Sequence, residues 1–516
     1  MRQLADILLR EEYPSLETRF TEVREASPAY QEYMSLQPKA EQDFLVGISR
    51  WLQQRRAIEV VVGLYLLAFS VRLVLALLAG INTPFEKDAK EYFDAASFLV
   101  QGHGYSRLWE DGVVRLSAKR VPGASLFLAL GILLFGPHPA AGRFIEIVVS
   151  SFSAPLLYCF ARRISAAVPA ILSGLCCALY PSWVFISGMA VTSEAFLVPL
   201  LLLSLVLTVR VLDLRSAGTA FSAGLAWGVA TLVRPITAPM AAIVALYLAW
   251  RAGWKRGLLL GTGFALILSP WLVRNYFVFG QPLLSTQGGE VFLGANNSYV
   301  LDVPRRHGDW VSPTELPAYR DKVKGVVDEV ALDHLEYNLA LDFLRKNPGS
   351  MPRLVFYKLK RWLTPITETA GLVRLLVLVS YGPLLLLLLV GIFRGIYRRS
   401  ATLYLVTMWS VVLAVITVVY WGILTRGRFL LELVWIPWAC LSFCNLLGIG
   451  AHDPTSRVLL IWRPDSPQAL RNNIGAISQL EFRVLSFPQL LGRRSSRLNS
   501  AVRKRKFPVF GNGVAI

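Results

Sequence analysis

The sequence predicts an all-α protein that crosses a membrane about ten times. Of its 516 residues, 54% are hydrophobic and only 17% are charged, whereas soluble domains carry about 25% charged residues. Apolar runs close to the roughly 20 residues that span a bilayer recur along the chain. These runs are continuous blocks without the alternation of an outer-membrane barrel strand, so we expect a helical bundle.

The chain begins with residues 1–56, which are polar and of mixed charge. A secretory signal peptide would place an apolar core within roughly the first 30 residues, and none is evident here. We therefore interpret residues 1–56 as a cytosolic N-terminal extension with short amphipathic helices.

Ten segments are candidate membrane spans. They are 57–80, 144–161, 166–187, 194–212, 218–233, 236–250, 257–274, 371–393, 401–420 and 428–449. Residues 121–136, "VPGASLFLALGILLFG", are apolar but shorter. We expect this segment to be an interfacial or partly inserted helix.

The distribution of basic residues sets the predicted orientation. Suppose that the segment 121–136 does not cross the membrane and that "QQRR", before the first span, is cytosolic. Most of the other basic stretches then lie in the cytosol too. These are "ARRIS", "RVLDLR", "RAGWKR", "RGIYRR" and the tail with "RKRK". The positive-inside rule favours this arrangement, which places both termini in the cytoplasm.

This topology divides the chain into the extension 1–56, a transmembrane domain 57–449 and a basic cytosolic tail 450–516. Two long loops remain outside, at about 81–143 and 275–370, and loops of this length often carry function. The net charge of +19 lies mostly at helix ends and in the tail. That distribution fits topology and contact with anionic membrane lipids, and we predict no nucleic-acid partner.

The first outer loop opens with an acidic segment, "NTPFEKDAKEYFDAASFLVQGHGYS". On a helix, Asp88, Glu91 and Tyr92 share one face. The apolar residues form a stripe that consists of Ala89, Phe93, Ala96 and Leu99. We predict an amphipathic helix on the outer membrane surface. Glu86 and Asp88 either stabilise the positive end of the helix dipole or take part in chemistry.

Basic residues also gather on the predicted outer side, where the positive-inside rule disfavours them. They are Lys119, Arg120, Arg143, Arg234, Arg274, Lys358, Lys360, Arg361, Arg426 and Arg428. Any one alone fits a snorkelling anchor, but several on one face indicate a bound phosphate or diphosphate, whose geometry arginine matches. Glu194 lies at the predicted outer start of a helix. There its carboxylate either stabilises the positive end of the helix dipole or takes part in the site.

Carboxylates and cations at a membrane surface suit the transfer of a sugar from a lipid phosphate. A carboxylate would take the proton from an acceptor hydroxyl or amine as it attacks the sugar C1. Arginine and lysine would stabilise the charge that develops on the leaving lipid phosphate. Transfer with inversion needs one such base and no covalent intermediate.

Two ordered motifs in the first outer loop resemble those of the GT-C class of membrane glycosyltransferases. "KDAKEYFDAASFLVQGHGYS" is similar to the first outer loop of the bacterial branch related to protein O-mannosyltransferases and lipid A aminoarabinose transferases (glycosyltransferase family 39-like). The matching residues are Asp88, Tyr92, Ala96, Leu99, Gly102, Gly104 and Tyr105. "KRVPGASLFLALGILLFG" is similar to the next element through Arg120, Pro122, Gly123 and Gly136, although Ala124 and Ser125 replace the usual Tyr-Pro.

Four further stretches follow in the order of the same family. "LYPSWVFISGMAVTSEAF" matches through Pro181, Ser193 and Glu194, and "GLAWGVATLVRPIT" resembles the family's helix that ends in Arg-Pro. "STQGGEVFLGANNSY" resembles a glycine and asparagine loop, with Glu290 in place of an aromatic residue. "RGRFLLELVWIPWA" resembles the last helix, with Glu432 at the first proline position.

The resemblance covers about residues 57–449 and implies a function and a set of site residues. It implies an inverting transferase that takes a hexosyl or pentosyl group from a polyprenyl-phosphate donor, with an outer-face (periplasmic) active site in a bacterial inner membrane. The acceptor would be a glycan, a lipid or a protein of the cell envelope.

The family pattern assigns roles to particular residues. Asp88 is the implied catalytic base. Arg120, Arg234 and Arg428 match donor-phosphate ligands, while Arg274 and Arg426 are proposed from position alone. The supporting residues are Glu86, Tyr92, Lys119, Glu194, Asn296 and Asn297. Some members of this class need a divalent ion and others do not, so metal use stays open, with Glu86 beside Asp88 as a candidate ligand.

Two other functions fit parts of the pattern. One is a transporter or flippase of a lipid-linked or anionic solute, since transporters also pair intramembrane charges with helix breaks. The charges here, however, lie at the predicted outer surface rather than at the midplane, and no two-fold repeat is visible. The other is a non-catalytic scaffold that docks a partner through 1–56 or the tail.

Overall fold

The computed structural model of the protein describes residues 57–449, with gaps at 110, 190, 318, 366–370, 398 and 423–424, and the side chains of 425–427 are not described. These residues belong to the first of two units into which the chain divides, Met1–Val458 and Leu459–Ile516. The predictions for 1–56 and 450–516 and for the side chain of Arg426 lie outside the described residues.

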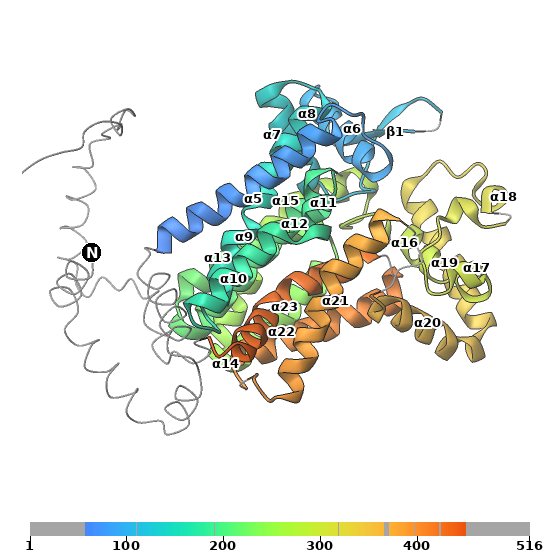
Figure 1. The fold of residues 1–516 in the computed structure, drawn as a ribbon. Coiled ribbons are helices and arrows are strands. Elements are labelled where there is room, and N and C mark those ends of the chain that lie inside the picture. The colour runs from blue at the N-terminus through green and yellow to red at the C-terminus, as the bar shows by residue number, and fades with distance from the viewer. Residues whose placement is uncertain are drawn as a thin grey trace, which may run out of the picture. The chain divides into compact units, whose positions relative to one another are not determined.

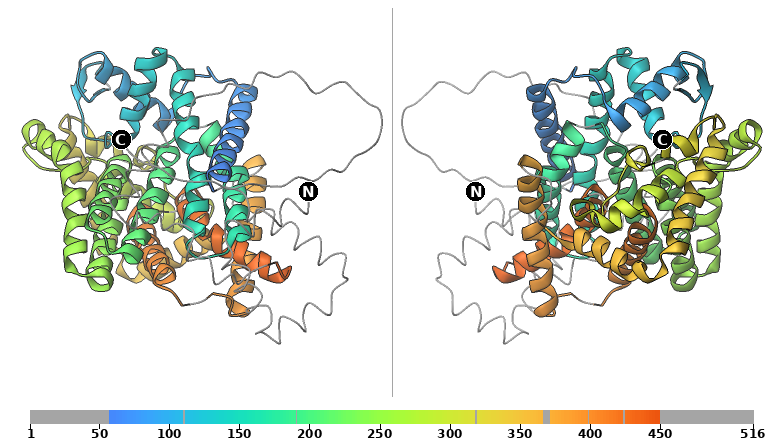
Figure 2. Two further views of the ribbon diagram at one scale, coloured as in Figure 1. Left: turned by 90° about the vertical axis from the view of Figure 1, so that its left-hand side faces the viewer. Right: turned by 90° about the vertical axis from the view of Figure 1, so that its right-hand side faces the viewer.

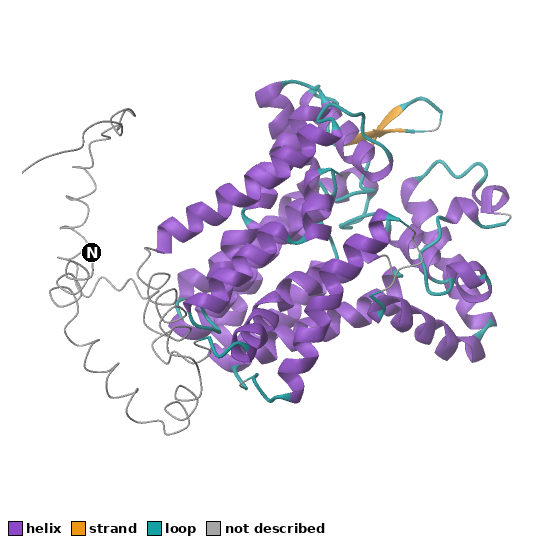
Figure 3. Cartoon of the chain, viewed as in Figure 1, coloured by secondary structure: helices purple, strands orange, loops and turns teal. Residues whose placement is uncertain are grey.

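Helices make up nearly all of the described structure (Figure 3). They are α5 Ala57–Ala79, α6 Lys87–Val100, α7 Gly123–Phe135, α8 Pro139–Ser151, α9 Ser153–Ala161, α10 Ala167–Leu179, α11 Pro181–Gly188, α12 Ser193–Leu214, α13 Ala217–Val233, α14 Thr237–Ala252, α15 Trp254–Phe279, α16 Gly288–Ala295, α17 Ser298–Asp302, α18 Tyr319–Val323, α19 Glu329–Lys346, α20 Met351–Leu363, α21 Leu372–Phe393, α22 Ala401–Ile416 and α23 Thr425–Leu446. Four short turns, of which the last is π-helical, are η1 Pro304–Arg306, η2 Pro313–Glu315, η3 Pro348–Ser350 and η4 Thr417–Trp421.

The two strands found in the described residues form a small hairpin in the first outer loop. β1 (Ser106–Leu108) and β2 (Val114–Leu116) pair antiparallel, with Arg107 opposite Arg115. The prediction of an all-α membrane protein is therefore confirmed.

Among the described residues, seven helical segments are long and apolar enough to cross a membrane. They are Ala57–Ala79, Pro139–Ala161, Ser193–Leu214, Trp254–Phe279, Leu372–Phe393, Ala401–Trp421 and Arg428–Leu446. α10 and α11 meet at a bend of 47° and together make an eighth, because Pro181 follows the end of α10 and interrupts its hydrogen bonding. The other two predicted spans coincide with α13 and α14, which are apolar but only 17 and 16 residues long.

Two predicted boundaries differ from the structure by five residues each: α15 continues to Phe279 rather than ending at residue 274, and the second span starts earlier than predicted. The second span begins at Pro139 rather than at residue 144, because His138 accepts the N-cap hydrogen bond from Ala141 and Pro139 occupies the first turn. Arg143 consequently lies inside α8 and donates to the carbonyl oxygens of Ile81 and Thr83. It anchors the start of the first outer loop instead of facing an open surface.

Small residues let α13 and α15 approach closely. A side-chain carbon added at Gly224 of α13 would lie only 2.1 Å from the carbonyl oxygen of Leu260 in α15. By contrast, Gly261, the next residue of α15, has no atom within 4 Å of the same position. The register between these two helices therefore depends on Gly224 and not on Gly261.

This difference gives a matched pair of variants. We expect Gly224→Ala to destabilise the protein by about 1–3 kcal/mol, because the extra carbon overpacks the helix contact. Gly261→Ala should be neutral or slightly stabilising, because alanine restricts the unfolded chain more than glycine does. Thermal unfolding of the purified proteins in detergent compares the two, and equal midpoints would contradict the predicted helix contact.

Both outer loops lie at the same end of the long helices, as Figures 1 and 2 show. α6 packs its predicted apolar stripe against the main core: Ala96 is fully buried, and Ala89, Phe93 and Leu99 are partly buried. The second loop, which contains α16 to α20, has its own small apolar clusters around Phe292 and Val300. The backbone N–H of Thr286 donates to the carbonyl of Ala118 at 3.0 Å and joins the two loops.

Candidate functional site

The predicted acidic face of α6 converges on one arginine. Arg120 Nη2 lies 2.9 Å from Asp88 Oδ1, and Arg120 Nε lies 2.8 Å from Glu91 Oε2. The guanidinium carbon is 5.2 Å from the centre of the Tyr92 ring. One helical turn thus presents three side chains to Arg120, as their spacing predicts. Glu86 is the N-cap residue of α6, and its side chain makes no capping hydrogen bond.

Lys119 extends this cluster toward the second outer loop. Its Nζ lies 3.0 Å from Glu91 Oε1 and 3.5 Å from Glu290 Oε2 of α16. Burial by itself would lower the pKa of Lys119, but Glu290 and Glu91 raise it above its ordinary value. Similarly, burial opposes ionisation of Glu91, but Arg120 and Lys119 outweigh it and lower the Glu91 pKa. Lys119 and Glu91 are therefore both charged at neutral pH.

The charge on Arg120 is still more firmly fixed. Burial favours its neutral form, but Tyr92, Glu91 and Asp88 together raise the Arg120 pKa well above its ordinary value. Its side chain is only 16% exposed, whereas Asp88 and Glu91 are 35% and 41% exposed. Arg120 is thus more deeply buried than the two carboxylates that pair with it, and both carboxylates can be reached from solvent.

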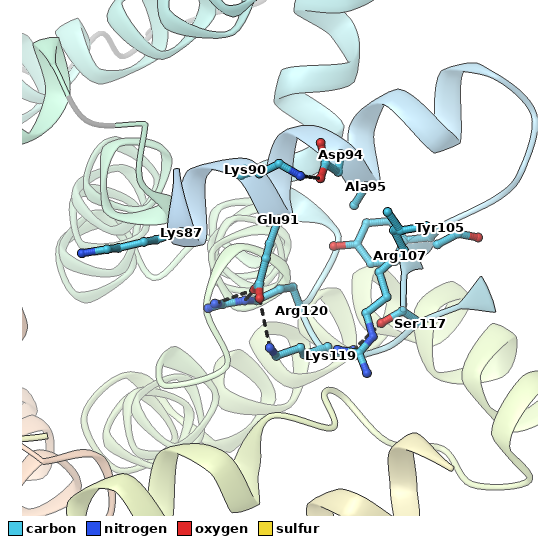
Figure 4. Close-up of a pocket in the computed structure, with 12 residues that line it drawn as sticks. Lys87, Lys90, Glu91, Asp94, Ala95, Tyr105, Arg107, Ser117, Lys119 and Arg120 are labelled. Atoms are coloured by element: carbon cyan, nitrogen blue, oxygen red, sulfur yellow. Dashed lines mark hydrogen bonds and ion pairs between the residues drawn. The ribbon is translucent and has the colours of Figure 1, made fainter. Parts of the chain in front are cut away.

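A cavity of about 300 Å³ opens between α6 and the β-hairpin (Figure 4). It is lined by Lys87, Lys90, Glu91, Asp94, Ala95, Tyr105, Ser106, Arg107, Leu108, Ser117, Lys119 and Arg120. Five of these residues are basic and two are acidic, so the cavity favours anions. Asp88 does not line it and is connected to it through Arg120.

A second ion pair lies at the start of α12 and the end of α13. Arg234 contacts Glu194, which is buried, and the Arg234 guanidinium carbon is 4.3 Å from the centre of the Trp421 ring. Its chain segment touches that of Arg120: a side-chain carbon added at Gly123 would lie 2.6 Å from the Leu232 carbonyl oxygen. The structure therefore brings together the two segments that carry the predicted phosphate ligands.

Arg274 and Arg428 have partners of a different kind. Arg274 donates to the carbonyl oxygens of Ser117 and Tyr105, both at 2.9 Å, and so holds the first outer loop. Arg428 is 4% exposed and pairs with Glu432 at 2.6 Å, while its Nη1 donates to the carbonyls of Trp362 and Thr364 at the end of α20. Both arginines thus bind protein groups, and among the described residues Arg428 Nη2 is buried without a hydrogen-bond partner.

Asn296 and Asn297 shape the second outer loop. Asn297 caps α17, since its Oδ1 accepts from the Val300 N–H at 3.2 Å. Asn296 Oδ1 accepts from Lys358 Nζ at 2.9 Å, and Lys358 also donates to the Val418 carbonyl at 2.9 Å. Burial lowers the pKa of Lys358 to about 7. Asn296 and Lys358 thus join the loop to η4, whereas Asn297, and Arg361 through Asp309 at 3.0 Å, fix it internally.

Each polar departure from the family pattern pairs with a polar side chain of a matched segment. Ser125 Oγ lies 3.3 Å from the Tyr105 hydroxyl, and Glu290 pairs with Lys119. Glu432 pairs with Arg428 and also accepts a hydrogen bond from the Tyr180 hydroxyl at 2.7 Å. The local packing at these positions is therefore intact, although the residues differ.

Sequence reasoning missed two residues that connect the loops. Arg107 lines the cavity, and Glu329, the first residue of α19, is buried against both outer loops. Glu329 has no recognisable local signal, because an acidic residue in a first helical turn is ordinary and its partner Ala118 is 211 residues away. No group of three His, Cys, Asp or Glu residues that could hold a metal occurs in the described part of the chain.

Comparison with known proteins supports the resemblance predicted from the motifs. A family model described as dolichyl-phosphate-mannose-protein mannosyltransferase matches residues 119–273. The match includes Lys119, Arg120, Glu194 and Arg234, and it ends before Arg274 and the second outer loop. It confirms the similarity to GT-C class glycosyltransferases. No curated protein matches the chain significantly.

Two solved structures show weak overall likeness. ArnT from Cupriavidus metallidurans bound to undecaprenyl phosphate is 16% identical, with 75% of this chain and 78% of that chain covered and a TM-score of 0.36. The second is the archaeal oligosaccharyltransferase AglB from Archaeoglobus fulgidus, in complex with an inhibitory peptide and a dolichol-phosphate. It is 15% identical, with 83% of this chain and 55% of that chain covered and a TM-score of 0.43. At these values the likeness assigns neither residues nor substrates.

Proposed function

We propose that this chain is an inverting glycosyltransferase that moves a sugar from a polyprenyl-phosphate donor to an acceptor at the outer face of a bacterial inner membrane. The observation that carries the proposal is the cluster of Asp88, Glu91 and Arg120, which joins a partly exposed carboxylate to a buried cation. Arg120 lies within the segment that matches the mannosyltransferase family model. The donor named in that family description is a polyprenyl-phosphate sugar.

The cluster suggests how the donor phosphate is held. Glu91 contacts Lys119 and Arg120 at once, so one carboxylate occupies the place between two cations that a phosphate oxygen would take. A donor phosphate would compete with Glu91 for these cations. As a diester it carries one negative charge, as Glu91 does, and its charge rises as the polyprenyl phosphate leaves, so Lys119 and Arg120 would stabilise the leaving phosphate most strongly. Arg234, on the neighbouring segment, would hold a second phosphate oxygen, with Glu194 fixing its orientation.

Asp88 has the position of the base. It contacts the same arginine that would hold the leaving phosphate, through Nη2 at 2.9 Å. Asp88 would accept the proton of the acceptor hydroxyl or amine as the new bond to C1 forms. The bond from C1 to the phosphate oxygen breaks, and Arg120 and Lys119 stabilise the negative charge on the polyprenyl phosphate that leaves.

The remaining predicted ligands have secondary roles in this proposal. Arg274 supports the site by holding the first outer loop through the Ser117 and Tyr105 carbonyls. Arg428 would reach a donor only if its ion pair with Glu432 opened. The sugar, the acceptor and any divalent ion are not assigned.

Mass spectrometry of cells with and without the gene tests this function. We expect loss of the gene to remove one glycosylated envelope component and to raise the level of one polyprenyl-phosphate sugar, because its consumer is absent. A transporter of lipid-linked solutes would change the distribution of the lipid across the membrane without a product made by the purified protein. Unchanged glycan and lipid-linked sugar profiles would contradict the proposed reaction.

A further inference from the structure

The segment that leads into Arg120 is held by residues from elsewhere in the chain. Residues 117–119 form neither helix nor strand, so their backbone polar groups need other partners. Arg274 Nη1 donates to the Ser117 carbonyl at 2.9 Å, and the Thr286 N–H donates to the Ala118 carbonyl at 3.0 Å. Ser285 Oγ donates to the Lys119 carbonyl at 2.7 Å. α15 and the second outer loop thus set the path of the chain before Arg120.

Glu329 completes this arrangement from the start of α19. Its Oε1 accepts hydrogen bonds from the Ala118 N–H at 2.9 Å, from Ser117 Oγ at 3.2 Å and from the Thr286 hydroxyl. Its Oε2 lies 3.5 Å from Arg107 Nε. The residue is 6% exposed, so a single buried carboxylate contacts the segment before Arg120, the β-hairpin and the second outer loop.

We propose that Glu329 is a positioning residue for the phosphate-binding cations Lys119 and Arg120. Apolar packing at this junction is small: Ala118 is buried with Tyr105 and Trp271 in a minor cluster. The polar contacts to Glu329 therefore act together with those from Arg274, Ser285 and Thr286 to hold the chain where it leads into Arg120. Arg120 needs that position to reach Asp88 and Glu91 at 2.9 and 2.8 Å. A displacement of about 1 Å at such a site can cost about a hundredfold in rate.

The inference rests on the proposed function, since it concerns cations assigned to the donor phosphate. Its test compares Glu329→Ala and Glu329→Gln with Glu336→Gln in the full-length protein. Glu336 is a matched control because it is buried on the same helix and accepts a hydrogen bond from Tyr319 inside the second outer loop. Glu329→Gln keeps an acceptor for the Ala118 N–H but loses the negative charge opposite Arg107. This variant tests the inference if Glu329→Ala does not fold.

Two measurements are made on each protein: binding of undecaprenyl phosphate, and amide hydrogen exchange across residues 117–120. We expect Glu329→Ala to weaken binding by at least about tenfold and to speed exchange in this segment. Glu329→Gln should show smaller changes in the same direction. Glu336→Gln should leave both values within about twofold of the wild type, because the described hydrogen bond of Glu336 is with Tyr319 inside the second loop and Lys119 is the weakest of the charges that act on it.

The outcomes separate failure of the inference from failure of the proposed function. If the wild type binds undecaprenyl phosphate and Glu329→Ala binds it equally well, the positioning role is wrong whatever the exchange shows. The same conclusion follows if Glu336→Gln weakens binding as much as the Glu329 variants do. If the wild type does not bind undecaprenyl phosphate, the donor assignment itself is refuted and the positioning role falls with it.

Discussion

Replacing Asp88 by asparagine should lower sugar transfer by roughly a thousandfold, as expected for loss of a general base. Asparagine has the same shape and can still accept the hydrogen bond from Arg120 Nη2. It cannot take a proton from the acceptor, so the chemical step fails while the cluster remains assembled. The measurement is turnover of a polyprenyl-phosphate sugar by the purified protein, together with binding of undecaprenyl phosphate, which should change little.

Asp94→Asn is the matched control for this substitution. Asp94 lies on the same helix and pairs with Lys90 at 2.9 Å, where both side chains are exposed. An exposed pair of this kind contributes about 0.3–0.5 kcal/mol, so transfer should fall by no more than about twofold. Full activity of Asp88→Asn, or an equal loss in both variants, would remove Asp88 from the mechanism.

Replacing Arg120 by glutamine should have the largest effect on donor binding. A hydrogen bond to a charged group contributes about 1.5–3 kcal/mol, so we expect undecaprenyl phosphate to bind roughly 10- to 100-fold more weakly. The substitution also leaves Asp88 and Glu91 without their shared cation, and their negative charge then repels the phosphate. Arg120→Lys should recover part of the affinity, because it restores the charge but not the two-pronged geometry.

Two further variants locate this effect. Arg234→Gln should also weaken donor binding, whereas Arg115→Gln should not, because Arg115 pairs with Asp111 at the exposed tip of the β-hairpin. The concentration of acceptor needed for half-maximal rate should change less than the donor affinity in every case. Unchanged donor affinity in both Arg120→Gln and Arg234→Gln would show that the phosphate binds elsewhere.

The parts of this structure that depend on local sequence could be predicted. Hydropathy located apolar helices at all ten predicted spans, because a bilayer-spanning helix satisfies its own backbone. The spacing of Asp88, Glu91 and Tyr92 predicted that they share a face, and the structure places all three against Arg120. The order of motifs indicated Arg120 as a phosphate ligand, but its contacts with these three residues were not predicted.

The parts that depend on distant contacts could not be predicted in the same way. The sequence indicated that Arg274 and Arg428 are outer cations, but their carbonyl and carboxylate partners follow from tertiary packing. The assignment of Arg143 to an open loop failed because a cap at His138 begins the helix earlier. Glu329 was missed because its partners lie on other elements, and nothing near it in sequence marks it.

A structure of the protein with undecaprenyl phosphate bound tests the central claim most directly. We predict that the phosphate lies at the end of the helices that carries the outer loops. There it contacts Arg120 together with Lys119 or Arg234, and Asp88 faces it across the space for the sugar. A phosphate bound at the opposite end of the helices, or one with no contact to Arg120 and Arg234, would contradict the account.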